Sequence, residues 1–261
     1  MTMHSIAARL TPASLRLRLN VRRALSNGEP EMHLLPLLCD PGRKSLDIGA
    51  CRGVYAACLL QHSSGVIAFE PQPYYADFIR RALPRVEVMQ CAVSDEESEA
   101  VLHVPDDAAD GGMAYLDSAG PRAVEFPASI RVRSVTVSGL DIDNVGFIKI
   151  DVEGLELAVL RGARDLIAAD LPNLLVEAED RHRRDAVASV YAFLKPLGYE
   201  GWFLMDGTLH SVDTFDADLH QGPAALAARL ADGRDGRPPY INNFIFVQPR
   251  VSESLRNSLG R

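Results

Sequence analysis

The sequence predicts an α/β protein with a mostly parallel, seven-stranded sheet, helices on both faces of the sheet and a small β-hairpin insertion. Two observations support this class. Short apolar segments of strand length alternate with amphipathic helical patterns along most of the chain. The chain has 261 residues, 47% of them hydrophobic, which is enough to bury one large core. We therefore expect a single domain over residues 31–248.

Seven segments are short, apolar and bounded by turn residues. They span residues 44–48, 66–70, 86–91, 145–151, 173–179, 200–204 and 243–248. Helical patterns lie between them: one ends at Pro84, one follows Gly154 and one ends at Gly198. Because a helix separates most consecutive strands, we expect these strands to run parallel.

Residues 99–137 interrupt this alternation. The segments AVLHV (100–104) and IRVRSVTV (130–137) alternate in polarity like antiparallel strands, and the loop between them is rich in Asp, Gly and Pro. We interpret the piece as a hairpin insertion. Residues 249–261 are treated as a C-terminal tail.

Residues 1–30 are expected to form a basic N-terminal arm. Between residues 4 and 28 the chain has five arginines and no acid, and leucines lie among the arginines. The arginines are Arg9, Arg16, Arg18, Arg22 and Arg23. Such a segment either packs on the domain, as a helix or a strand, or presents a basic amphipathic surface to an anionic lipid or glycolipid. We favour packing and leave peripheral membrane contact open.

Charge and cysteine content exclude several classes of function. A net charge of −8 repels polyphosphate, so a nucleic-acid substrate is not expected. The four cysteines form no C-x-x-C pair and have no histidine at a metal-binding spacing, which indicates neither a zinc site nor a disulfide framework. A reducing cytoplasm suits them. No apolar stretch approaches the roughly eighteen residues that a membrane span requires.

The first strand runs into a turn of the form D-x-G-x-x-x-G, with Asp47, Gly49, Ala50 and Gly53. A dinucleotide-binding turn needs a glycine where this chain has Cys51, because a pyrophosphate must approach the backbone there. An NAD-dependent oxidoreductase is therefore kept only as an alternative. A strand-end carboxylate beside glycines suits a small ligand that has an ammonium group and no phosphate, as S-adenosylmethionine does.

The next two strands add to the same predicted ligand site. Glu70 ends the second strand, where an acid can accept hydrogen bonds from both ribose hydroxyls, and Pro71 fixes the turn that follows. After the third strand, Ala92 and Ser94 are small enough to leave room for an adenine. Taken singly, each acid could instead be a helix cap or a turn residue.

Motifs along most of residues 31–248 resemble the FkbM-type S-adenosylmethionine-dependent methyltransferases. They are DIGACRG (47–53), VIAFEPQP (66–73), CAVSD (91–95), FIKIDVEGLELAVLRGA (147–163), LLVEAEDRH (174–182), LGYEG (197–201) and YINNFIFV (240–247). The I-K-I-D-V-E-G-x-E run is specific to that family. The resemblance implies a Rossmann-like class I methyltransferase fold and methyl transfer to hydroxyl oxygens of sugars, glycans or secondary metabolites. Cys51 stands where the family usually has Asn.

Five side chains form the predicted acceptor site: Asp151, Glu153, Glu177, Glu179 and His182. Asp151 ends the fourth strand and is also counted with the cofactor residues. Transfer to a hydroxyl needs alignment and a general base, for which Asp151 is the first candidate. Alternatively, these residues have only structural roles: Glu153 caps a helix, Glu177 is an acid whose hydrogen bonds are made within the protein, and His182 is exposed.

Two further alternatives remain for this site. The acids could gather Mg²⁺ or Mn²⁺, but their spacing dictates no octahedral site, so we expect no metal. The chain could also bind S-adenosylmethionine without catalysing transfer.

Overall fold

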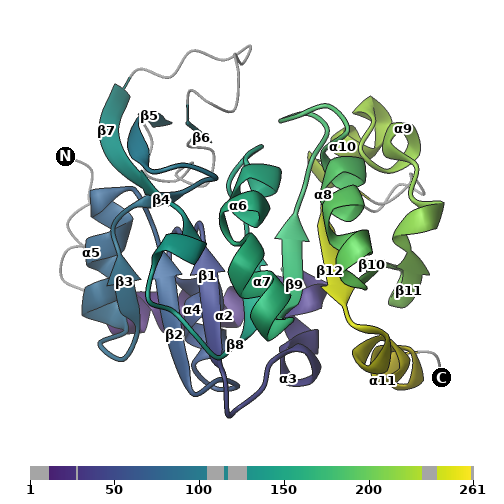
Figure 1. The fold of residues 1–261 in the computed structure, drawn as a ribbon, viewed down its shortest axis with the longest axis horizontal. Helices are drawn as coiled ribbons and strands as arrows, with labels where there is room; N and C mark the ends of the chain where they lie inside the picture. The colour runs from purple at the N-terminus through teal and green to yellow at the C-terminus, as the bar shows by residue number, and fades with distance from the viewer. Residues whose placement is uncertain (1–11, 28, 105–114, 117–127, 231–239, 260–261) are drawn as a thin grey trace.

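The protein is described by a computed structural model that covers residues 12–27, 29–104, 115–116, 128–230 and 240–259. Within these ranges the centre of the molecule is an eight-stranded sheet. Its spatial order is β11 (Thr208–Ser211), β10 (Glu200–Met205), β12 (Asn243–Val247), β9 (Asn173–Glu177), β8 (Val145–Ile150), β1 (Lys44–Ile48), β2 (Gly65–Phe69) and β3 (Glu87–Met89). Figure 1 shows this sheet between two layers of helices.

The chain order places a switch point between β1 and β8. From β1 the chain moves outward through β2 and β3, and it later returns to the other side of β1 with β8 and β9. These five strands pair in parallel. Strand β12 pairs antiparallel with both β9 and β10. In open α/β sheets, ligands bind in the crevice at the carboxyl ends of the strands at such a switch point. The predicted class is confirmed.

Two apolar layers hold the helices on the sheet. On one face, α6 (Glu156–Gly162), α7 (Arg164–Asp170) and α8 (Ala186–Leu194) pack on Leu46, Ile48 and Ile148. On the other face, α3 (Leu35–Leu38), α4 (Val54–Leu59) and α11 (Pro249–Leu259) pack around Phe147 and Leu175. Helix α5 (Pro73–Ala82) contributes Ile79 to this second layer. Successive strand residues alternate between the layers, as a sheet buried on both faces requires.

Short elements complete the chain. They are η1 (Pro30–Leu34), η4 (Val137–Gly139), η5 (Lys195–Leu197), η6 (Val212–Thr214), α9 (Ala217–His220) and α10 (Pro223–Leu230). Among the helices of the described ranges, none is long and apolar enough to cross a bilayer.

The insertion is larger than the predicted hairpin. Its two strands, β5 (Ser98–Val104) and β7 (Ala128–Val135), pair antiparallel as expected. They belong to a second sheet of order β4-β7-β5-β6, with β4 (Ala92–Val93) and β6 (Tyr115–Leu116), drawn at the upper left of Figure 1. The predicted third strand, 86–91, is shorter in the structure, because β3 ends at Met89 and the chain then joins the second sheet as β4. Most of the predicted loop, 105–114 and 117–127, lies outside the described residues.

The predicted strand count of seven was wrong by one. Strand β11 forms a hairpin with β10 through Asp206 and Gly207, whose φ angles of 51° and 75° are both left-handed. An Asp-Gly pair with two positive φ angles is typical of a tight two-residue hairpin turn. The sequence therefore contained the signal for the eighth strand.

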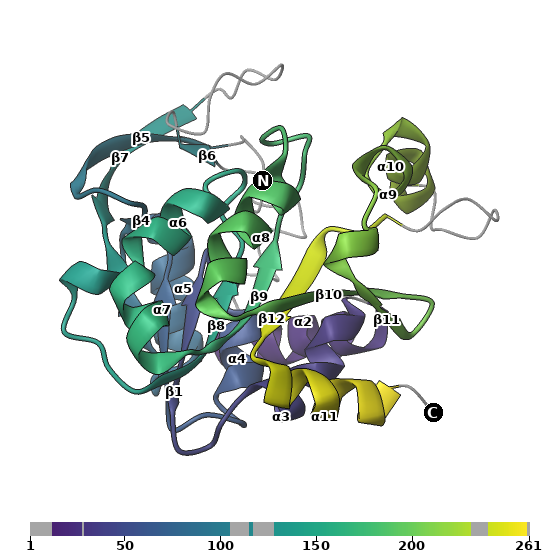
Figure 2. The same ribbon diagram turned by 45° about the vertical axis from the view of Figure 1, so that its right-hand side comes forward.

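The first and last helices of the described residues both pack on the domain. The arm forms α2 (Ala13–Asn27), not a strand, and Leu17, 2% exposed, packs with Phe78 and Ala82 of α5. Residues 1–11 of the arm lie outside the described residues. The segment treated as a tail forms α11, whose Leu255 is fully buried. Figure 2 shows α11 beside α3.

A tight contact joins the second sheet to α6 and predicts a steric cost. A Cβ on Gly162 would lie 1.9 Å from the carbonyl oxygen of Ser94, so Gly162→Ala must push α6 away from β4. We expect a loss of about 1–3 kcal/mol in the free energy of unfolding, measured by urea denaturation. Gly65→Ala is the matched control, because a Cβ at Gly65 meets nothing within 4 Å. Equal stability of the two variants would contradict the contact.

Candidate functional site

The carboxyl ends of β1 and β8 meet at the switch point. The backbone N–H of Asp151 donates to the carbonyl of Ile48 at 3.0 Å. Gly49 follows with φ +84°, and a Cβ there would lie 1.8 Å from the carbonyl oxygen of Asp151. Position 49 therefore needs a glycine for two reasons. Its backbone is left-handed, and the two strand ends approach too closely for a side chain.

The turn after β1 is tied to the end of β2. Glu70 Oε2 accepts a hydrogen bond from the backbone N–H of Cys51 at 2.7 Å, and Oε1 accepts from Gln72 N–H at 2.8 Å. Each carboxylate oxygen retains lone-pair capacity for another donor. Glu70 is 3% exposed, and burial raises its pKa to about 7, opposed by these two hydrogen bonds.

Cys51 has φ +45° and Gly53 has φ +70°. The left-handed region is costly for most side chains and is adopted most readily by Gly and Asn. The Asn usual in the family at this place would fit the conformation better than Cys51 does. Burial raises the pKa of the Cys51 thiol to about 12, so this thiol is a poor nucleophile at neutral pH.

Asp47 lies in β1, just before the turn, and is only 2% exposed. Burial raises its pKa to about 7, opposed by Lys149 and by a hydrogen bond from Ala56 N–H in α4. Within the described part of the chain, Asp47 Oδ2 is buried without a hydrogen-bond partner. Asp47 thus links the start of α4 to the charged cluster described next.

Lys149 is the centre of a buried charge cluster that sequence reasoning missed. It lies inside β8 and is 1% exposed. Its Nζ atom lies 3.7 Å from Asp151 Oδ2, 3.8 Å from Glu177 Oε2 and 5.0 Å from the ring centroid of Tyr55. Burial alone would lower the pKa of Lys149, but Asp151 and Glu177 outweigh it and raise the pKa above its usual value. A lysine within an otherwise apolar strand was the available signal.

The cluster extends to the segment before η1 and to β9. The hydroxyl of Tyr55 donates to Glu29 Oε2, which joins α4 to the residues after α2. Glu177 accepts a hydrogen bond from Asn242 Nδ2. Burial and the nearby Asp151 raise the pKa of Glu177 well above its usual value, with Lys149 opposing.

Of the two acids that face Lys149, Asp151 is the more exposed. Its side chain is 37% exposed, whereas that of Glu177 is 15% exposed. Burial of the carboxyl raises its pKa, Lys149 opposes the shift, and Glu153 adds to it. A partly exposed acid with a raised pKa at a switch point is a candidate proton acceptor.

Glu153, His182 and Glu179 form a second cluster. His182 Nε2 lies 2.9 Å from Glu153 Oε2 and 3.7 Å from Glu179 Oε1. Glu179 also accepts hydrogen bonds from Arg181 Nε at 2.5 Å and from the hydroxyl of Tyr240. Burial would raise the pKa of Glu179, but hydrogen bonds from His182, Arg181 and Tyr240 outweigh it and hold the pKa below its usual range.

These contacts differ in detail from the expected arrangement. Glu177 and Glu179 were expected on the same side of a strand, but β9 ends at Glu177 and the two acids bind different partners. Glu153 does not cap a helix, because α6 starts at Glu156. Instead Glu156, an acid that sequence reasoning did not single out, accepts from Gly154 N–H at 2.7 Å, and burial raises its pKa to about 7.

The remaining predicted cofactor residues lie on neighbouring turns. Ala50 N–H and Gly49 N–H both donate to the carbonyl of Phe69, and Pro71 follows Glu70 before α5. Ala92 and Ser94 lie at β4, where Ser94 is 8% exposed and Ser94 N–H donates to the carbonyl of Val135. In the described ranges, no three His, Cys, Asp or Glu side chains are grouped so that they could hold a metal ion.

The sequence profile of the methyltransferase FkbM domain matches residues 47–200, which is more than half of the chain. The chain belongs to the FkbM methyltransferase family. The match runs from Asp47 to the start of β10. It therefore includes Glu70 as well as Asp151 and His182, one from each cluster. It decides in favour of a methyltransferase over an oxidoreductase.

A solved structure agrees with this assignment at the level of the fold. The methyltransferase is similar to the FkbM methyltransferase from Methylobacillus flagellatus KT, with 18% identity and a TM-score of 0.50, over 93% of this chain and 57% of that one. A weaker similarity, with 12% identity and a TM-score of 0.45, links it to a precorrin-6y C5,15-methyltransferase from Geobacter metallireducens GS-15. That match covers 87% of this chain and 91% of the other.

A curated relative is the AMB antimetabolite synthetase AmbE of Pseudomonas aeruginosa. It is 24% identical to this methyltransferase over 76% of the present chain. The matched region is only 11% of the synthetase, so the methyltransferase resembles one segment of a much longer protein.

The buried acids predict how stability changes with pH. Glu31, Asp47, Glu70 and Glu156 each have a pKa raised by burial to about 7. Between their usual pKa values and 7, the folded chain binds protons that the unfolded chain has released, so stability falls as pH rises through this window. We expect the melting temperature without ligand to be lower near pH 8 than near pH 5.5, by an amount that corresponds to about 1 kcal/mol or more.

The same measurement on Glu156→Gln isolates one of these acids. Because Gln has no carboxyl to ionise, its pH slope should be smaller than that of the wild type. Glu253→Gln, on the exposed surface of α11, should keep the wild-type slope. A melting temperature that rises from pH 5.5 to pH 8 would show that these acids ionise without cost.

Proposed function

We propose that this methyltransferase uses S-adenosylmethionine to methylate a hydroxyl of a sugar, a glycan or a secondary metabolite. The observation that carries the proposal is Asp151, a partly exposed acid beside the Gly49 turn with Lys149 behind it. Similarity to a segment of an antimetabolite synthetase supports a small metabolite as acceptor. The net charge of −8 argues against a nucleic-acid acceptor. A cytoplasmic location, expected from the cysteines, remains part of the proposal.

The described residues fit S-adenosylmethionine, which has a sulfonium and an ammonium group. Glu70 and Asp151 directly follow β2 and β8, the strands on either side of β1, and the turn after β1 contains Gly49 and Gly53. Glu70 is held by two backbone N–H groups in one orientation and can accept from ribose hydroxyls. We assign the cofactor to Asp47, Gly49, Ala50, Gly53, Glu70, Pro71, Ala92, Ser94 and Asp151. Asp47 is buried in β1, so it would act on the cofactor from inside the protein.

When bound, S-adenosylmethionine supplies an electrophilic methyl group. The protein must hold the acceptor oxygen in line with that group and remove its proton. Asp151 takes the proton in this proposal, because its raised pKa lies closer to neutrality than that of an ordinary aspartate. Lys149 favours the ionised form of Asp151, and burial together with the nearby Asp151 raises the pKa of Glu177 well above its usual value.

The second cluster is assigned to acceptor binding. His182 and Glu153 can donate to and accept from sugar hydroxyls, and Arg181 and Tyr240 orient Glu179. We propose a metal-free mechanism, since the cationic Lys149 already occupies the position between Asp151 and Glu177.

The direct test is methyl transfer from labelled S-adenosylmethionine to a panel of sugars and hydroxylated metabolites, read as S-adenosylhomocysteine formed. Methylation at oxygen on one panel member supports the proposal. Tight S-adenosylmethionine binding without turnover on any acceptor would favour a binding-only protein. Calorimetry with NAD in parallel should show no binding.

Glu70→Ala tests the cofactor site. We expect S-adenosylmethionine binding to weaken by roughly 1–3 kcal/mol, the scale for losing charge-assisted hydrogen bonds. Glu87→Ala, an exposed position on β3 of the same sheet, is the control and should bind like the wild type. Calorimetric titration of both variants measures the difference. Wild-type affinity in Glu70→Ala would remove Glu70 from the cofactor site.

Asp151→Asn tests the general base and separates it from a metal mechanism. Turnover on the identified acceptor should fall by about a hundredfold or more. This loss should exceed any loss of S-adenosylmethionine affinity, because Asn keeps the shape of the side chain but cannot take the proton. Asp77→Asn, on the surface of α5, should leave turnover unchanged. Wild-type activity should persist in excess EDTA. Loss of activity on chelation would support Mg²⁺ or Mn²⁺, and full activity of Asp151→Asn would exclude this base.

A further inference from the structure

Helix α2 combines a buried face with an exposed face of unusual composition. Leu17, Val21 and Ala24 pack toward the domain. Leu15 and Leu19 are nonetheless 47% and 58% exposed. The packing role expected for the arm therefore accounts for only one side of the helix.

The exposed face is a stripe of alternating leucines and arginines. Leu15, Arg18, Leu19, Arg22 and Leu25 follow a spacing of three or four residues and are all exposed. Residues three or four apart share one side of a helix, so these five form a continuous surface, which we call the α2 stripe. Arg23 is also exposed beside it.

The charge of this surface is not neutralised within the helix. Residues 13–27 contain four arginines and no acid, in a chain with a net charge of −8. The first acids after the helix are engaged elsewhere, since Glu29 accepts from the hydroxyl of Tyr55 and Glu31 is buried. Arg16 lies over the ring of Phe78, 5.2 Å from its centroid, and so belongs to the packed side.

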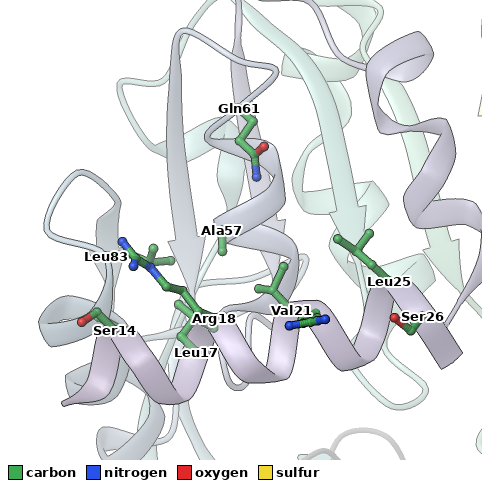
Figure 3. A pocket seen from close by; sticks show the side chains of 11 residues that line it. Ser14, Leu17, Arg18, Val21, Leu25, Ser26, Ala57, Gln61 and Leu83 are labelled. Atoms are coloured by element: carbon green, nitrogen blue, oxygen red, sulfur yellow. The ribbon is translucent and has the colours of Figure 1, made fainter.

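An open groove of about 490 Å³ runs along one flank of the stripe. Figure 3 shows Leu17, Val21 and Leu25 of α2 on one side of the groove and Ala57 and Leu83 opposite them. Arg18 and Arg22 also line it. The groove thus offers an apolar floor next to two cationic groups, which matches an acyl chain attached to an anionic headgroup.

We propose that the α2 stripe and its groove dock this protein on a membrane surface that contains anionic phospholipid. Exposed leucines interleaved with arginines are the pattern of helices that lie in the bilayer interface, where the apolar side chains insert and the cations meet phosphate. A binding site on an acidic protein would need the arginines and would not require two protruding leucines. This inference is independent of the proposed reaction, because α2 packs on the outer side of α4 and α5 and contributes no residue to the proposed site.

The test is flotation of the full-length protein with vesicles. Vesicles of phosphatidylcholine and phosphatidylglycerol in equal parts should carry the protein, and pure phosphatidylcholine vesicles should not. About 0.5 M NaCl should reduce the bound fraction strongly, because it screens the arginines. Absence of binding to the anionic vesicles would overturn the proposal and leave an acidic protein as the occupant to seek.

Four variants assign the binding to α2. Arg18→Glu with Arg22→Glu should lower the bound fraction at least about tenfold. Arg164→Glu with Arg250→Glu, on α7 and α11, makes the same change in net charge and should bind like the wild type. Leu15→Ser with Leu19→Ser should also weaken binding, and wild-type binding by this variant would overturn insertion. Deletion of residues 1–11 should preserve binding, and loss on deletion would overturn the assignment to α2.

The three substitution variants should retain the wild-type circular dichroism spectrum and S-adenosylmethionine affinity, since every substituted side chain is exposed. Equal vesicle binding by the double arginine variant and its charge-matched control would overturn the proposal, because binding would then follow net charge alone.

Discussion

The close approach of Gly49 to the backbone of Asp151 is the constraint on which the site depends. It joins the ends of the adjacent strands β1 and β8 at the point where the chain order reverses. A side chain at Gly49 would need space that the Asp151 carbonyl occupies. This single contact places the turn that carries Ala50 and Cys51 beside the acid that we assign to proton transfer, although about a hundred residues separate them.

Buried charge is the second feature of the site, and it depends on the first. Lys149 faces Asp151 and Glu177 from inside the sheet, so an isolated buried cation is balanced by two acids. Removing one member of such a group is costly, because the remaining charge has no water around it. The arrangement leaves Asp151 the more exposed of the two acids. The same local charge would then serve both folding and the deprotonation of a hydroxyl.

Family membership and fold both indicate a methyltransferase, but neither identifies the acceptor. The FkbM profile covers residues 47–200 and so establishes a methyltransferase. In our proposal, the acceptor is recognised by contacts such as those of His182 with Glu153 and of Tyr240 with Glu179. These contacts come from loops after β8 and β9 and from the segment before β12, and binding residues usually lie on such loops.

The sequence by itself determined the α/β class, the central parallel strands and the acids at their ends. These features are local: apolar runs of strand length, the D-x-G-x-x-x-G turn and strand-final acids such as Glu70 and Asp151 can be recognised without knowing their neighbours. The Asp206-Gly207 turn was equally local, and the eighth strand could have been predicted from it. The helical form of α2 was left open because alternation and helical spacing overlap in a short leucine-arginine segment.

Only the tertiary structure decided how these residues are grouped. Whether Glu177 lies with Lys149 or with Glu179 depends on the residue at which β9 ends, and one residue changes the direction of a side chain. The departure of β4 into a second sheet depends on its pairing with β7, about forty residues later. Likewise, the exposure of Leu15 and Leu19 on α2 is set by the surfaces of α4 and α5 that cover the opposite face of the helix. Pairings and burial of this kind are properties of distant segments together, and no single stretch of sequence contains them.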